Sequence, residues 1–323
     1  MGISHFAIVN ADTDAAVVAV CDTTGYVLSV LEKYTGVETY KDFKPMIDKA
    51  GLDAVVIATP TATHFDCANY ALSKGLHVFV EKPLTLTLGQ SRALAEMAQV
   101  RKVVNQVGFH NRFIGTFAEA RRLVAAGALG DIYHVHGSAF GHVVTREEAG
   151  MWRSKKSEGG GCLHDYACHV IDLMNSIVGS PSRVRGARLQ QVFSKNVEDA
   201  VYAVFEYPSG ASGHLETNWC DPTYRKMTTS IVVYGSAGKL VADRQELKVY
   251  LKAPFESYAE GWTMRYITDL QRSVSFYLRG EEYSAQMASF VAAIKAGNTN
   301  HENTFASACD ADRTIEMITQ AAG

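Results

Sequence analysis

Residues 54–83 read AVVIATPTATHFDCANYALSKGLHVFVEKP, and this stretch decides the fold. An apolar run covers Ala54 to Ala58, and a second covers His77 to Val80. The residues between them, His64 to Lys74, have the spacing of a helix. Continuous apolar strands are typical of parallel sheets that are covered on both faces. The stretch therefore predicts a strand, a helix and a second, parallel strand.

The same alternation extends in both directions along the first third of the chain. Further apolar strands are expected at 16–21 and 102–107, and further helices at 27–34 and 88–99. Alternating strands and helices predict a doubly wound parallel sheet, the α/β architecture of a Rossmann-type nucleotide domain. Ligands of such sheets bind beyond the carboxyl ends of the strands. The residues found there are Asp22, Thr59-Pro60-Thr61, Glu81-Lys82-Pro83 and Gly108–Arg112.

Asp22 closes the strand at 16–21. A carboxylate at this position can accept hydrogen bonds from the hydroxyls of an adenosine ribose, and it would repel a 2′-phosphate. Because no arginine lies beside it, NAD is favoured over NADP as the cofactor. The alternative is an ordinary helix cap before Thr23 and Thr24.

The first residues lack part of the expected pattern. A dinucleotide fold begins with a strand and a Gly-rich turn into its first helix, but no G-x-G-x-x-G occurs in this sequence. Met1 to Phe6 already has the character of the end of that turn, with Gly2 as its last glycine. We expect the given sequence to be truncated, either in this version or through a start codon upstream. The alternative is a protein that lost the strand and binds cofactor poorly.

Three glycines, Gly159 to Gly161, lead into a segment with apolar residues at helical intervals from Leu163 to Ile177. Asp165 and His169 are four residues apart there, so a helix would place them on one face. A carboxylate beside an imidazole can orient it and favour its protonated form, which suits proton transfer near neutral pH. The alternative is a surface ion pair on a structural helix.

Beyond residue 113 the alternation gives way to neighbouring strands. A helix at 116–126 is followed by strands at 132–140, 184–192, 200–207, 211–219, 228–234 and 239–242. Pro208-Ser209-Gly210 predicts a hairpin turn between two of them. The pattern indicates an α+β domain with a large, mostly antiparallel open sheet. We therefore expect a nucleotide domain at 1–113 and a substrate and oligomerisation domain at 114–323, with helices at 286–294 and 306–321.

The composition excludes several classes of protein. At 323 residues, 47% apolar and 20% charged, the chain can form two domains with full cores. A net charge of −3 gives no reason to expect nucleic acid or an anionic membrane as partner. No apolar run is long enough to span a bilayer, and no secretory signal is evident. The six scattered cysteines indicate reduced thiols in a cytoplasm.

Several motifs in order resemble the Gfo/Idh/MocA family, named for glucose–fructose oxidoreductase, inositol dehydrogenase and rhizopine catabolism. The motifs are Ile57 to His64, Val80 to Pro83, Gly108 to Phe113, Gly127 to Ile132, Trp152-Arg153 and the opening stretch. They keep the order and spacing found in that family.

The resemblance implies an NAD(P)-dependent dehydrogenase that acts on a secondary alcohol of a sugar, a sugar derivative or a cyclitol. His169 would remove the hydroxyl proton, Asp165 would orient that histidine, and Lys82 would hold the reacting oxygen. A lysine at a strand's carboxyl end can also favour a developing alkoxide electrostatically. The cofactor contacts implied are at Gly2, Asp22, Thr59, Pro60, Thr61, His64, Glu81, Lys82, Pro83, Asn111, Trp152, Arg153 and Tyr283. The open sheet would join subunits of a homodimer or homotetramer.

Other assignments remain open. A nucleotide-sugar 3-dehydrogenase, a dihydrodiol or keto-sugar reductase, and a non-catalytic sugar-binding or regulatory protein are the alternative functions. Lys155 and Lys156 either meet an acidic or phosphorylated substrate or form a solvated basic loop. His134 and His136 share a strand face, but no metal-ligand spacing is recognisable around them, so no metal is expected.

Overall fold

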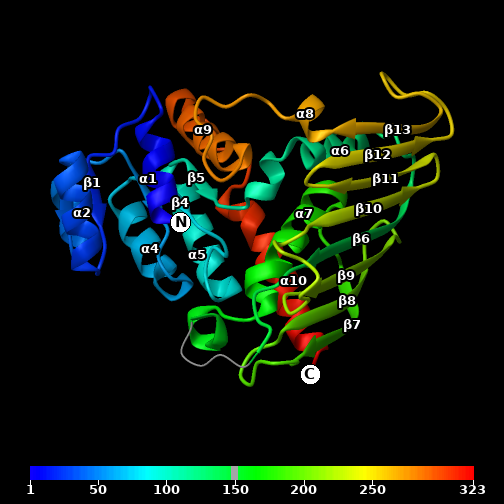
Figure 1. Cartoon of the computed structure of the whole chain (residues 1–323), viewed down its shortest axis with the longest axis horizontal. Helices are drawn as coiled ribbons and strands as arrows, with labels where there is room; N and C mark the ends of the chain where they lie inside the picture. Colours follow the sequence, from blue (N-terminus) through cyan, green and yellow to red (C-terminus); the bar gives the residue numbers. More distant parts are fainter. Residues whose placement is uncertain (147–151) are drawn as a thin grey trace. The chain divides into compact units, whose positions relative to one another are not determined.

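The computed structural model describes residues 1–146 and 152–323 (Figure 1). The chain divides into two units. The first consists of Met1–Thr85, Gly89–Gly108 and Ser273–Ala306, and the second of Leu86–Leu88, Phe109–Arg272 and Ser307–Gly323. The tail thus contributes to both units: Ser273–Ala306 to the first, and most of the last helix to the second.

The first unit alternates strands and helices as predicted. Its elements are α1 (Gly2–Asn10), β1 (Ala19–Cys21), α2 (Gly25–Thr35), β2 (Glu38–Tyr40), α3 (Phe43–Lys49), β3 (Ala54–Ile57), a 3₁₀ turn (Thr61–Thr63), α4 (His64–Ser73), β4 (His77–Val80), α5 (Leu88–Arg101), β5 (Asn105–Val107) and α9 (Glu281–Ala296). All its strand pairs are parallel. The Rossmann-type sheet is confirmed, while β2 and α3 were not predicted.

The parallel strands of this unit form two separate pieces. One piece is β1-β2, and the other is β3-β4-β5. In the order 3-2-1-4-5-6 of a dinucleotide-binding sheet, the place between them belongs to the first strand. Within the described residues no strand pairs with the free edges of β1 and β3, so the ladder is interrupted at its centre.

The core of the first unit joins segments that are far apart in sequence. Phe79 of β4 packs edge-on against Phe290 of α9, with ring centroids 5.9 Å apart. Ile8 of α1, Met287 and Val104 complete this buried cluster. Because Phe79 is fully buried between α1 and α9, the end of β4 that leads to Glu81 starts from a rigid support.

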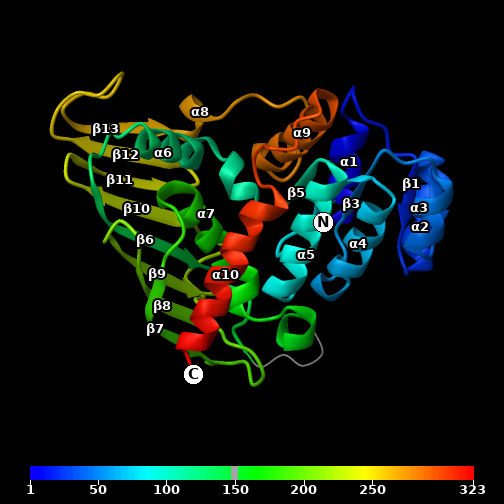
Figure 2. The same cartoon turned by 180° about the vertical axis from the view of Figure 1, so that it is seen from behind.

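The second unit is one large sheet with helices on one face (Figure 2). Its strands are β6 (Ile132–Phe140), β7 (Arg183–Gln190), β8 (Ala200–Glu206), β9 (Ser212–Asn218), β10 (Ser230–Gly235), β11 (Gly238–Asp243), β12 (Glu246–Leu251) and β13 (Gly261–Tyr266). Its helices are α6 (Gly115–Ala125), α7 (Cys168–Val178), α8 (Ile267–Leu270) and α10 (Phe305–Ala321), with short helical turns at His110–Phe113, Trp152–Ser154, Lys156–Glu158 and Leu163–Ala167.

The strand order is β13-β12-β11-β10-β6-β9-β8-β7, and every pair except β6-β9 is antiparallel. The predicted hairpin at Pro208-Ser209-Gly210 is confirmed as the link between β8 and β9. Burial alternates along β10 and β11, as expected for a sheet with one covered face. A Cβ at Gly137 on β6 would collide with Val170 and Met174, so glycine allows α7 to lie directly on the sheet.

In the described residues, no helix is long and apolar enough to cross a membrane. All six cysteines are free thiols, namely Cys21, Cys67, Cys162, Cys168, Cys220 and Cys309.

Candidate functional site

The carboxyl ends of β3, β4 and β5 lie at one edge of the first unit. Ile57 pairs with Val80, and Val80 with Val107, so the residues that follow the three strands are level with one another. A Cβ at Gly108 would lie 3.0 Å from Oε2 of Glu81, a tight contact, so these two residues are close neighbours. The predicted motif residues Thr59, Glu81 and Gly108 are therefore brought together.

His64 connects two of these strand ends. Its Nε2 lies 2.9 Å from the carbonyl oxygen of Thr59, and its Nδ1 lies 2.9 Å from the carbonyl oxygen of Pro83. The ring is 1% exposed, and this burial lowers the pKa of His64. The contacts that the structure shows for His64 are thus to the backbone, and its predicted contact with a cofactor stays a prediction.

Asp22 follows β1 and accepts a hydrogen bond from the backbone N–H of Thr24, 2.7 Å from its Oδ1. This is a local turn contact before α2, whose N-cap residue is Thr24, so Asp22 is not the helix cap proposed as the alternative. It engages one carboxylate oxygen, so a ribose hydroxyl could still be accepted by the other. Gly2 is the first residue of α1, and a Cβ there would meet no atom within 4 Å.

The glycine run before the second motif is required by its surroundings. Gly159 and Gly161 have φ of +85° and +108°, which side chains disfavour. A Cβ on Gly160 would collide with the carbonyl of Arg153, and one on Gly161 with the carboxylate of Glu198. That carboxylate accepts a hydrogen bond from the N–H of Leu163 at 2.8 Å and so caps the helical segment. Burial raises the pKa of Glu198, and the bond from Leu163 opposes the rise.

The helical segment itself differs from the expectation. Leu163–Ala167 form a π-helical turn, and the α-helix α7 begins at Cys168. The expectation of one regular helix from Leu163 was wrong for its first turn, which is π-helical. The four-residue rule for a shared face therefore does not apply between Asp165 and His169, and direct contact between them stays a prediction. Single π-turns are frequent at functional sites.

Asp165 and His169 are nonetheless both buried, at 8% and 4% exposure. Oδ2 of Asp165 accepts a hydrogen bond from Nε of Arg153 at 3.0 Å. The His169 ring packs edge-on against the ring of His110, with centroids 4.8 Å apart. The burial of both residues argues against the alternative of a surface ion pair, although Asp165 does pair with Arg153, whose side chain is 35% exposed.

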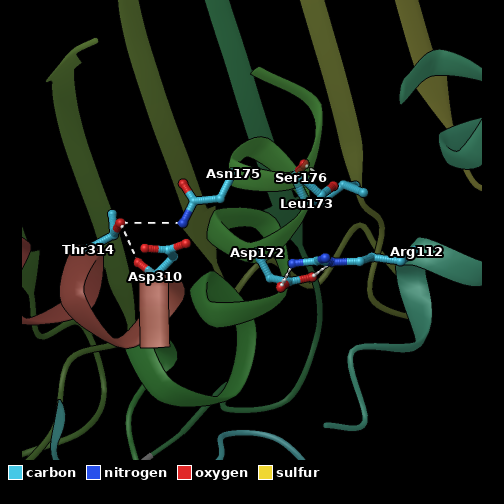
Figure 3. A network of polar contacts seen from close by, with 7 residues as sticks. All are labelled: Arg112, Asp172, Leu173, Asn175, Ser176, Asp310 and Thr314. Atoms are coloured by element: carbon cyan, nitrogen blue, oxygen red, sulfur yellow. Dashed lines mark hydrogen bonds and ion pairs between the residues drawn. The ribbon is translucent and has the colours of Figure 1, made fainter. Parts of the chain in front are cut away.

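Sequence reasoning missed an ion pair one turn beyond His169. Figure 3 shows the guanidinium of Arg112 directed at Asp172 of α7, with bonds of 2.9 Å from Nε and 2.6 Å from Nη2. The side chains are 9% and 1% exposed. A bidentate pair at this depth fixes α7 against the turn that carries His110. The signal available in the sequence was the position of Asp172 three residues after His169, which places the two close together on a helix.

Arg244 was also missed. This arginine follows β11, and its Nη1 lies 3.0 Å from Oδ1 of Asn111 and 3.5 Å from Nε2 of His110. Asn111 is 1% exposed, and its Nδ2 has no hydrogen-bond partner within the described residues. A buried amide donor of this kind calls for an acceptor, and a hydroxyl or carbonyl oxygen of a bound molecule fits that need. No local pattern links residue 244 to residue 111.

The remaining predicted residues belong to different units of the chain. Arg153 stacks over the ring of Trp152 at 4.7 Å, so these two form one unit with Asp165. Tyr283 packs against the core of the first unit, and Arg279 lies over its ring. Lys155 pairs with Glu158 at 2.9 Å in an exposed loop. This contact favours a solvated basic loop over a substrate contact for Lys155.

Lys82 belongs to the first unit, and Asp165 and His169 belong to the second. Their joint action on one substrate is therefore a prediction. Among residues 1–146 and 152–323, no group of three or more histidine, cysteine, aspartate or glutamate side chains could hold a metal ion.

Comparison with known proteins gives consistent matches in both parts of the chain. Residues 1–109 match the model of an oxidoreductase family with an NAD-binding Rossmann fold, and residues 117–241 match the GFO/IDH/MocA C-terminal domain. Scyllo-inositol 2-dehydrogenase (NAD(+)) of Bacillus subtilis is 30% identical over 211 residues, 64% of this chain and 59% of that protein. Rhizopine catabolism protein MocA of Rhizobium meliloti is 33% identical over 182 residues, 55% of this chain and 56% of that protein.

These matches span less than two thirds of the length of either relative. Among solved structures, GenD2 from gentamicin A biosynthesis in complex with NAD has a TM-score of 0.81 at 26% identity. That match covers 100% of this chain and 91% of GenD2. The sequence motifs, the fold and the two domain models agree, and the chain belongs to the Gfo/Idh/MocA family of oxidoreductases with an NAD-binding Rossmann domain.

Proposed function

We propose that the chain is an NAD-dependent oxidoreductase that acts on a secondary alcohol or ketone of a sugar, a sugar derivative or a cyclitol. The observation that carries the proposal is the buried His169 of α7, whose ring packs against His110 and whose helix is fixed by the Arg112–Asp172 pair. The similarity to a scyllo-inositol dehydrogenase and to MocA supports a cyclitol or a related polyol as the substrate.

In this proposal, His169 accepts the proton of the substrate hydroxyl as the carbon that bears it loses a hydride, so that an alcohol becomes a ketone. NAD supplies the acceptor for that hydride. Asp165 holds the site through Arg153, and Lys82 donates a hydrogen bond to the reacting oxygen and stabilises its developing negative charge. The buried N–H of Asn111 is a further donor for an oxygen of the bound molecule or the cofactor.

The cofactor preference follows from Asp22. A carboxylate at the end of β1 favours ribose hydroxyls over a 2′-phosphate, so we propose NAD, with NADP bound less well. We also propose a homodimer or homotetramer that forms through the open sheet. The free thiols of all six cysteines support a reducing compartment, and we propose the cytoplasm.

The test is turnover of a panel of cyclitols and sugars with NAD, for the parent chain and for Lys82→Ala and His169→Asn. We expect both variants to lose turnover by about 10²-fold or more, as is typical when a proton-transfer residue or a donor to a developing oxyanion is removed. Circular dichroism should show the parent fold. Parent-like turnover in either variant would remove that residue from the mechanism.

A further inference from the structure

Two buried histidines hold the segment Glu81-Lys82-Pro83 from its two ends. His5 comes from α1 and His64 from the start of α4, and they are 2% and 1% exposed. Both lie in the first unit together with the segment they contact. Neither was assigned this role from the sequence.

His5 fixes the residue before Lys82. Its Nε2 lies 2.7 Å from Oε1 of Glu81, whose side chain is 13% exposed. The His5 ring is itself held edge-on against Phe79, with centroids 5.2 Å apart. Since the other carboxylate oxygen lies against Gly108 and 3.3 Å from the backbone nitrogen of Lys82, the Glu81 side chain is confined on several sides.

His64 fixes the residue after Lys82. Its Nδ1 faces the carbonyl of Pro83 and its Nε2 the carbonyl of Thr59, both at 2.9 Å. A neutral imidazole has one N–H and donates to one carbonyl, whereas an imidazolium donates to both. Burial lowers the pKa of His64, and the two carbonyls and the Glu81 carboxylate oppose that fall. The ring lies between the two carbonyls and donates a hydrogen bond to at least one of them in either state.

We propose that His5 and His64 are positioning residues that determine where the Lys82 ammonium lies. This inference rests on the proposed function of Lys82. A lysine side chain rotates about four bonds, so its backbone must be held firmly if its ammonium is to meet one substrate oxygen. A displacement of about 1 Å at a reacting group can cost about 10²-fold in rate. The contacts of His5 with Glu81 and of His64 with Pro83, here called the histidine clamp, hold this backbone without either ring touching the substrate.

The chemistry of amide side chains gives a matched test. The amide nitrogen of asparagine mimics Nδ1 of histidine, and that of glutamine mimics Nε2. His64→Asn therefore keeps a donor toward Pro83, while His64→Gln keeps one toward Thr59. For His5 the order is reversed, because Nε2 makes the contact with Glu81, so His5→Gln keeps the bond and His5→Asn loses it.

We expect His64→Gln and His5→Asn to lower kcat about tenfold or more relative to His64→Asn and His5→Gln, with NAD affinity changed much less. Amide hydrogen exchange of residues 81–85 in the chain without cofactor is the second readout. Exchange should be faster in the two variants that lose the contact. His77→Asn is the control, since His77 accepts a backbone bond at the opposite end of β4 and should affect stability only.

Equal kcat and equal exchange within each pair would overturn the proposal, as would an equal effect in His77→Asn. Lys82→Ala is measured alongside. If Lys82→Ala retains turnover, the role that the proposed function gives to Lys82 fails. If Lys82→Ala loses turnover while the pairs behave alike, the positioning role alone fails. Where turnover is too low to measure, amide hydrogen exchange of residues 81–85 decides. Faster exchange in the variants that lose a contact supports the positioning role, and unchanged exchange contradicts it.

Discussion

Arg112 and Asp172 form the ion pair on which the geometry around His169 depends. Both side chains are almost fully buried, and their two hydrogen bonds join the turn before α6 to the middle of α7 (Figure 3). The same turn carries His110, whose ring packs against His169. The orientation of the candidate base is thus set by a contact that takes no part in the reaction.

Removal of one partner should be costly. We expect Asp172→Asn to destabilise the chain by about 3–5 kcal/mol, because it leaves the Arg112 guanidinium buried without its counter-ion. The double variant Arg112→Met with Asp172→Leu should recover much of this loss, since no charge is then buried. Urea unfolding followed by circular dichroism measures both. A single variant within about 1 kcal/mol of the parent would show that the pair contributes little.

At the residue scale, the sequence was informative where chemistry is local. Lys82, Asp165 and His169 were chosen from motifs, and the structure buries the last two and clamps the backbone around the first. Arg244 could not be found in this way. It reaches Asn111 over 133 positions of sequence, and only the folding of β11 brings the two together. His5 was missed for the same reason, since its partner lies 76 residues away.

At the scale of elements, strong periodicity predicted most helices and strands, and weak periodicity did not. β2 consists of three residues, Glu38 to Tyr40, and is too short to show a pattern. β12 and β13 carry charged or exposed residues at alternate positions, so they lacked the apolar runs that marked their neighbours. The interruption between β1 and β3 lies where a dinucleotide-binding sheet has its first strand.

A strand placed between β1 and β3 should complete the sheet. We expect a variant extended before Met1 by one apolar strand and a Gly-rich turn to melt at a higher temperature than the parent, because the free edges of β1 and β3 gain ladder partners. It should also bind NAD more tightly, since the turn offers backbone N–H groups to the pyrophosphate.

Differential scanning calorimetry and NAD titration measure these two effects. An extension of equal length made of glycine, serine and proline is the control. If both extensions behave alike, the gap between β1 and β3 does not accept a strand.

At the scale of the whole molecule, the burial of histidines links stability to pH. Desolvation lowers the pKa of His64, His77, His134, His136 and His301. Unfolding returns them to a pKa of about 6.5, so the unfolded chain binds more protons than the folded chain just below that pH. The free energy of unfolding should therefore fall as the pH drops below about 6.5.

Urea unfolding at pH 7.5, 6.5 and 5.5 measures how the free energy of unfolding depends on pH. In His64→Asn this dependence should be weaker by the contribution of one histidine. A free energy of unfolding that stays constant over this range would contradict the prediction, because carboxylates titrate mainly at lower pH.

The open face of the large sheet leads to a prediction about assembly. Trp262 of β13 is 60% exposed and lies beside Tyr250 of β12, with ring centroids 5.5 Å apart. If this face joins subunits as proposed, Trp262→Glu should shift the chain toward a smaller species in light scattering after gel filtration. Val100→Glu is the control, since Val100 is also apolar, is 79% exposed and lies on α5. Identical masses for both variants would place the interface elsewhere.

The π-turn before α7 has a consequence for how this region can change over evolution. A π-turn contains one residue more than an α-helical turn, and each residue of an α-helix rotates the chain by about 100°. Deletion of one residue within Leu163–Ala167 would therefore restore a regular helix and swing Asp165 to a different side of the axis, while His169 and Asp172 kept their phase. The acidic residue and the histidine can thus be re-aimed independently by a single insertion or deletion, without any substitution in the active site.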